Sequence, residues 1–128
     1  MITSIYAAIA GLMLFILSLR VITLRRKKRI AIAWNDDVEF KRAMRVQANF
    51  TEYVPLCLIL MFFLEMQAQA DPSLWIHTLG CLLIFARAVH AYGVSQIKEN
   101  FLFRQLGMFL TFTVLISASI RILLGHFF

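Results

Sequence analysis

The sequence is poor in acidic residues, proline, glycine and cysteine. Only 7 of its 128 residues are Asp or Glu, and charged residues of both signs make up 16% of the chain, against about 25% in soluble domains. This composition excludes a soluble domain with an ordinary polar surface. With two prolines and five glycines, the apolar stretches run without interruption, which favours membrane helices over a barrel.

The two cysteines, Cys57 and Cys81, both fall within apolar stretches, and their spacing matches no metal-binding pattern. A disulfide would require that the fold bring these two distant positions side by side. We therefore expect both to be buried as small hydrophobic residues, and we predict no metal site.

Hydrophobic residues dominate what is present, at 61% of the chain. They form four segments, each near the roughly 20 residues that a helix needs to cross a hydrocarbon core of about 30 Å. These segments use almost the whole length, so no room remains for a second domain. The sequence predicts one all-α domain over residues 1–128, a polytopic membrane four-helix bundle with helices at about 2–29, 39–67, 74–94 and 101–124.

The net charge is +6, but the basic residues cluster at the edges of the apolar segments, as expected for control of membrane topology. We therefore predict no nucleic-acid partner. If the N-terminus lies outside, all Lys and Arg residues except Arg121 fall at the inner ends and loops. This asymmetry predicts that both termini lie on the outer side. The basic run 25–29 is by itself typical of a topology signal. Between the first two helices, Asn35-Asp36-Asp37 is expected to form a turn and cap the second helix.

The polar stretch that opens the second helix is the main candidate for a site. Arg45, Asn49 and Glu52 are spaced i, i+4 and i+7, so they share one helix face. The apolar run from Val54 to Met66 is too short to cross a membrane alone, so the membrane-spanning part of the helix must include Asn49 and Glu52. Polar and ionisable groups at that depth usually mark a functional site.

Antiparallel threading of four helices brings further polar side chains to the same depth. A cavity lined in this way would suit a small anionic ligand, because Arg binds carboxylates in a bidentate manner and Glu52 can bind an ammonium group. The residues at this level are Arg20, Arg25, Arg26, Arg45, Gln47, Asn49, Glu52, Tyr53, Arg87, His90, Tyr92, Arg104 and Gln105.

Other interpretations of these residues remain open. Glu52 and Arg87 can instead form a buried ion pair that only fixes helix packing, and His90 alone is more often a packing residue. A small multidrug-type transporter with Glu52 as proton carrier fits four short helices, but it does not explain so many arginines beside one carboxylate.

The segment Arg45-Val-Gln-Ala-Asn-Phe-Thr-Glu-Tyr-Val-Pro-Leu56 resembles the R-x-Q-x-N-x-x-E-Y-x-P-L signature of the MAPEG family, the membrane-associated proteins in eicosanoid and glutathione metabolism. Phe85-Ala-Arg87 with His90 and Gly93 resembles the third-helix motif of that family. The resemblance spans all four helices and is strongest to the leukotriene-forming and microsomal glutathione transferase branch and to small bacterial members.

This resemblance implies a homotrimer of four-helix subunits that binds glutathione between subunits on the cytoplasmic side. The compact loops and the lack of a retention-like tail favour a multi-pass protein of a bacterial inner membrane over one of the endoplasmic reticulum. Glutathione would be the co-substrate for conjugating or reducing hydrophobic electrophiles that arrive from the lipid. Arg104 resembles the catalytic arginine that stabilises the glutathione thiolate. The matching glutathione-binding positions are Arg25 or Arg26 (from the neighbouring subunit), Arg45, Gln47, Asn49, Glu52, Tyr53, Arg87 and His90.

Two positions depart from the family pattern. His90 stands where the leukotriene branch has tyrosine, and Val94 stands where many members have a second tyrosine that helps to hold glutathione. The alternative is therefore a non-catalytic member of the same fold that binds a lipid or a partner.

Overall fold

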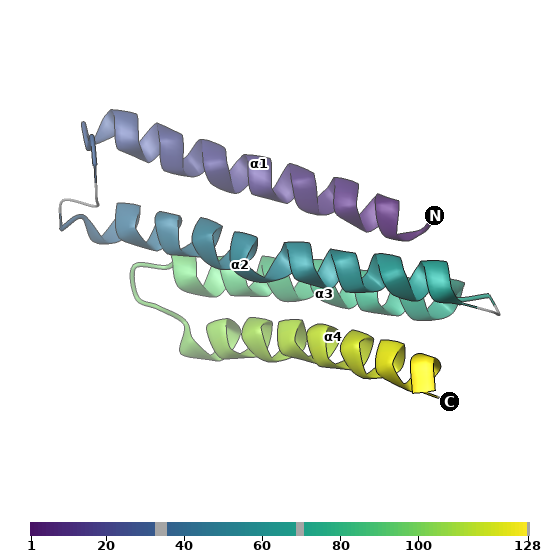
Figure 1. Ribbon diagram of the computed structural model, residues 1–128. Helices are drawn as coiled ribbons and strands as arrows, with labels where there is room; N and C mark the ends of the chain where they lie inside the picture. The colour runs from purple at the N-terminus through teal and green to yellow at the C-terminus, as the bar shows by residue number, and fades with distance from the viewer. Residues whose placement is uncertain (33–35, 69–70, 128) are drawn as a thin grey trace.

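The computed structural model describes residues 1–32, 36–68 and 71–127, and these fold into four long α-helices (Figure 1). The helices are α1 (Thr3–Lys27), α2 (Val38–Gln67), α3 (Ser73–Ser95) and α4 (Phe101–Phe127). Consecutive helices run antiparallel, so the N- and C-terminal ends lie at the same end of the bundle (Figure 1). Each helix is long and apolar enough to cross a membrane, which confirms the predicted all-helical architecture of four such helices.

The polar residues between α1 and α2 fix where α2 begins. Asp37 is the N-cap of α2, and its carboxylate accepts a hydrogen bond of 2.8 Å from the backbone N–H of Phe40. The same carboxylate lies 2.7 Å from the Lys28 ammonium at the end of α1. These contacts lower the pKa of Asp37 and raise the pKa of Lys28, so each charged group holds its partner ionised. The cap predicted within the 35–37 turn is confirmed at Asp37, whereas Asn35 lies outside the described residues.

The bundle buries one large apolar core and a smaller apolar cluster between α1 and α2, and it leaves a large apolar surface. Helices α1 and α4 each pack against both α2 and α3, so α2 and α3 form the centre of the bundle. Cys57, Met61 and Leu83 are fully buried in the core, while large side chains such as Phe15 and Phe109 are exposed. Exposed apolar area on this scale is expected of a protein that faces lipid or other subunits.

The two cysteines differ in burial. Cys57 is buried as predicted, but Cys81 is exposed, so the expectation that both are buried is wrong for Cys81. Both thiols are free, and the sulfur of Cys81 lies 3.2 Å from the hydroxyl of Tyr6 on α1. Cys81 faces outward because it occupies the edge of α3 next to α1, a rotation that the hydropathy of the segment does not reveal.

Glycines on α3 and α4 allow these helices to approach closely. A Cβ atom at Gly107 would lie 2.6 Å from the Cβ of His90 and 2.7 Å from its backbone nitrogen. Small residues commonly serve this purpose in membrane helix packing. The backbone of α4 therefore rests directly on the part of α3 that carries His90.

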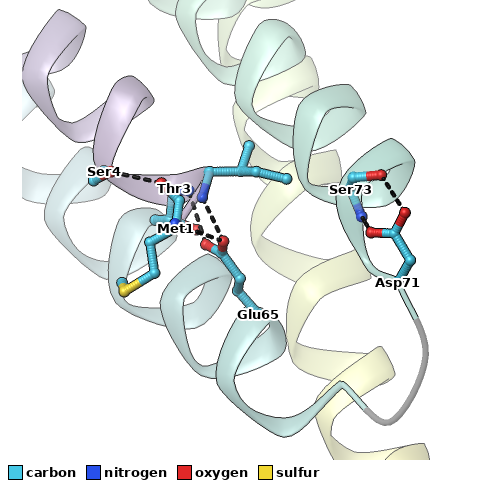
Figure 2. A network of polar contacts seen from close by, with 7 residues as sticks. Met1, Thr3, Ser4, Glu65, Asp71 and Ser73 are labelled. Atoms are coloured by element: carbon cyan, nitrogen blue, oxygen red, sulfur yellow. Dashed lines mark hydrogen bonds and ion pairs between the residues drawn. The ribbon is translucent and has the colours of Figure 1, made fainter.

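Glu65, near the end of α2, caps the beginning of α1 from a neighbouring helix (Figure 2). Its carboxylate accepts hydrogen bonds from the backbone N–H groups of Ile2 and Thr3, the latter at 2.8 Å. The first turn of α1 has no acidic residue and no side-chain cap of its own. A carboxylate from α2 thus satisfies donors that a helix otherwise leaves unpaired.

We predict that Glu65→Ala destabilises the protein by about 1–3 kcal/mol, because it leaves backbone donors of α1 unpaired and removes a charged acceptor. Thermal unfolding in detergent measures the effect. Glu39→Ala is a matched control, because Glu39 is a half-exposed carboxylate on the same helix whose ion pair with Lys28 is a surface contact of little energetic value. Equal unfolding temperatures for the two variants would contradict the capping role.

Candidate functional site

A cavity of about 330 Å³ opens at the end of the bundle that carries the α1–α2 and α3–α4 connections. Its volume is at the lower end of the range found for small-molecule sites. Helix α2 supplies most of the wall, and α3, α4 and their connection supply the rest. The lining residues are Val38, Lys41, Arg42, Arg45, Asn49, His90, Val94, Glu99 and Arg104.

Four of the predicted site residues meet in this cavity: Arg45, Asn49, His90 and Arg104. They come from three helices and are up to 59 positions apart in the sequence, so only the antiparallel arrangement brings them together. Three further lining residues, Lys41, Arg42 and Glu99, were not predicted from the sequence. Arg42 had a detectable signal, because it lies three residues before Arg45 and therefore on the same helix face.

The cavity carries an excess of positive charge. Lys41, Arg42, Arg45 and Arg104 contribute four cationic groups, and Glu99 is the one carboxylate among the lining residues. Guanidinium groups present several fixed N–H donors that match carboxylate oxygens. The arrangement therefore favours an anionic ligand.

Glu99 links two of these arginines. Its carboxylate accepts a hydrogen bond of 2.8 Å from Arg104 and lies 3.7 Å from the guanidinium of Arg42. Its side chain is only 14% exposed, whereas that of Arg104 is 49% exposed. The carboxylate therefore holds Arg104 at the cavity while leaving much of its guanidinium accessible. Glu99 lies in the connection between α3 and α4, where helical spacing carries no information.

Arg87 lies beneath the cavity rather than in its wall. Its side chain is buried, with 1% exposure, and donates a hydrogen bond of 2.7 Å to the amide oxygen of Asn49. The same nitrogen lies 3.2 Å from Nδ1 of His90, and the other terminal nitrogen lies 3.4 Å from the hydroxyl of Thr111. Arg87 therefore contacts two residues of the cavity wall from behind.

Glu52 does not form the buried ion pair with Arg87 that was considered from the sequence. Its carboxylate lies 3.8 Å from the guanidinium of Arg45, and the Glu52 and Arg45 side chains are 48% and 60% exposed. The pair stands on the outer face of α2, because the rotation of the helix turns Glu52 away from α3. That packing interpretation is therefore wrong.

The remaining predicted residues lie outside the cavity of a single subunit. Gln47 donates a hydrogen bond of 2.8 Å to the Ser18 hydroxyl of α1. The Tyr53 ring packs edge-on against Phe112, with ring centroids 5.5 Å apart. Arg25 donates a hydrogen bond of 2.7 Å to the carbonyl oxygen of Ala31 and lies over the ring of Phe40. Arg26 is exposed.

Comparison with known proteins agrees with the motif and the fold. The sequence model of the MAPEG family matches residues 3–124. The chain is 32% identical over 117 residues to the inner membrane protein YecN of Escherichia coli strain K12, covering 91% of this chain and 86% of the relative. YecN of E. coli O6:H1 strain CFT073 matches to the same extent. With its four apolar helices, the chain is a multi-pass integral protein of the inner membrane, and it belongs to the MAPEG family.

Proposed function

We propose that the protein is a glutathione-dependent transferase or peroxidase that acts on hydrophobic electrophiles dissolved in the membrane. The observation that carries this proposal is the convergence of Arg45, Asn49, His90 and Arg104 on one cationic cavity. Three of these residues lie in motifs typical of the family, and Arg104 stands near the position of its catalytic arginine. Family membership supports the same class of chemistry.

The charges of the cavity suit glutathione. The tripeptide carries two carboxylates, one ammonium and one thiol, so it needs several cations and at least one anion around it. Arg42, Arg45 and Lys41 offer the cations. Glu52, whose carboxylate lies 3.8 Å from the Arg45 guanidinium on the outer face of α2, offers the anion for the ammonium group.

Arg104 is the proposed catalytic residue. A thiol with a pKa near 8.5 is mostly protonated at neutral pH, and only its thiolate is a good nucleophile. A guanidinium within hydrogen-bonding distance favours the thiolate and lowers the thiol pKa. Arg104 has five N–H donors, so it can bind the sulfur while its Nη1 remains bonded to Glu99. The thiol proton goes to solvent through the open end of the cavity, and the thiolate forms a C–S bond with the electrophile as the leaving group departs.

We also propose that the working unit is a homotrimer with glutathione between subunits. A carboxylate exposed to lipid on a membrane-spanning helix is energetically costly, and Glu52 is 48% exposed in the single subunit. A neighbouring subunit would cover Glu52 and Tyr53. It would also bring the arginines at the end of its α1, Arg25 or Arg26, to the ligand.

A calorimetric titration with glutathione, combined with a conjugation assay on a hydrophobic aryl halide, tests the proposal on purified protein. We expect saturable binding and conjugation above the uncatalysed rate. Binding heat should disappear in the Arg45→Ala, Asn49→Ala double variant, because it removes the cation and the amide of one cavity wall. Absence of glutathione binding to the wild-type protein would contradict the proposal.

One observation favours a second candidate function. Val94 lines the cavity at a position where many relatives have a tyrosine that helps to hold glutathione. A site without this hydroxyl can belong to a member that binds a lipid or a partner and catalyses nothing. The titration separates the two functions. A non-catalytic protein of this kind releases no binding heat on addition of glutathione, and glutathione does not protect it against thermal unfolding.

A further inference from the structure

Arg87 is a fully buried cation whose terminal nitrogens contact only neutral groups. In the part of the chain that the structure describes, no carboxylate forms an ion pair with Arg87. Its contacts are with Asn49, His90, Thr111 and the sulfur of Met108. A buried charge is costly unless it is hydrogen-bonded, and the Nε of Arg87 has no hydrogen-bond partner among the residues that the structure describes. Because a guanidinium can only donate, these contacts determine which atoms of the neighbouring side chains must act as acceptors.

The first constraint falls on Asn49. A side-chain amide has one end that accepts and one end that donates, and a guanidinium can only donate. The atom that lies 2.7 Å from Nη2 of Arg87 must therefore be the amide oxygen. This leaves the NH₂ group as the end that Asn49 presents to the cavity it lines.

The second constraint falls on His90, which is also buried and also lines the cavity. Its Nδ1 lies 3.2 Å from the same Nη2 of Arg87. Because the guanidinium donates, Nδ1 must accept and carries no hydrogen. The neutral imidazole then has its hydrogen on Nε2. The two hydrogens of Nη2 are thus divided between Asn49 and His90.

We infer that Arg87 is a positioning residue that turns Asn49 and His90 into paired hydrogen-bond donors facing the cavity. This wall between α2 and α3 selects an acceptor group, such as a carboxylate or a peptide carbonyl oxygen, and rejects an ammonium. The inference stands whatever the ligand is. If the ligand is glutathione, as proposed above, one of its carboxylates or peptide carbonyls binds here, and its ammonium binds elsewhere.

The tautomer of His90 tests the inference without any ligand. The chain has three histidines, so ¹⁵N-histidine NMR in detergent micelles gives three sets of signals, and His90→Gln identifies the set of His90. We expect an unprotonated Nδ1 and a protonated Nε2 at neutral pH. In Arg87→Met, which keeps an apolar side chain of similar length but has no donor, we expect a mixture of tautomers. A wild-type His90 with a protonated Nδ1 would overturn the inference.

A substitution at Asn49 provides the binding test. Asn49→Asp keeps an oxygen for Arg87 but has no donor for the cavity, so we expect glutathione binding to weaken at least tenfold while the thermal unfolding temperature stays at or above that of the wild type. Asn100→Asp is the control, since it adds the same charge near the cavity at the N-cap of α4, where Asp is an equally good cap. Wild-type affinity in Asn49→Asp would contradict the inference. Failure of the wild-type protein to bind glutathione would contradict the proposed function alone, because the tautomer of His90 is measured without ligand.

Discussion

Replacing Arg104 with alanine is expected to lower kcat/KM for glutathione conjugation at neutral pH by about tenfold to a hundredfold. Loss of an adjacent guanidinium should raise the pKa of the bound thiol by about 1 to 3. The thiol would return toward its free pKa of about 8.5, at which only about 3% is thiolate at pH 7. The pH profile of kcat/KM for the electrophile, measured at saturating glutathione, reports this pKa, because the reacting species is then the glutathione complex. The rise in rate with pH should move to higher pH in the variant.

Two further variants make this test specific. Arg104→Lys keeps a positive charge and should recover part of the rate. Arg121→Ala removes an exposed arginine from the far end of the same helix and should leave both the rate and its pH profile unchanged. An Arg104→Ala protein with wild-type kcat/KM would show that Arg104 is not the catalytic residue.

Gly107→Ala is expected to destabilise the bundle by about 1–3 kcal/mol, in the range of overpacked core substitutions. The new Cβ would lie 2.7 Å from the backbone nitrogen of His90 and 2.8 Å from the carbonyl oxygen of Ala86. Neither atom belongs to a flexible side chain, so α4 must move away from α3. This movement would also displace His90 and Arg104 relative to each other, so we expect weaker glutathione binding as well. Thermal unfolding and calorimetric titration in detergent measure the two effects.

Gly11→Ala provides the matched control for this prediction. A Cβ at Gly11 would meet nothing within 4 Å, and alanine is the better helix former by about 1 kcal/mol. The control should therefore unfold at or slightly above the wild-type temperature. A Gly107→Ala protein that behaves like Gly11→Ala would show that α3 and α4 are not in close contact at this point.

The sequence predicted the four helices because each apolar segment has the length of one membrane crossing, a property independent of how the helices rotate. It also predicted that Arg45, Asn49, His90 and Arg104 lie at one depth, which requires only antiparallel helices of similar length. The lateral position of these side chains was not fixed by that reasoning. Their convergence on one cavity depends on helix rotation, which the family motif indicates and hydropathy does not.

The features that the sequence did not predict all depend on rotation or on connections between helices. Arg87 and His90 share a face of α3 by their spacing, but spacing does not show that Arg87 points beneath the cavity while His90 reaches it. Glu52 turns away from α3 for the same reason. Glu99 lies in a connection without periodicity, and Glu65 caps a helix more than 60 positions away along the chain.

The ultraviolet absorbance of the bound thiolate tests the central claim, that the cationic cavity binds glutathione and ionises its thiol. Difference spectra of the wild-type protein at neutral pH should show a thiolate band that grows with added glutathione and saturates at the binding stoichiometry found by calorimetry. The band should be strongly reduced in Arg104→Ala at saturating glutathione. Saturable binding to the wild-type protein without a thiolate band would contradict this account of the site.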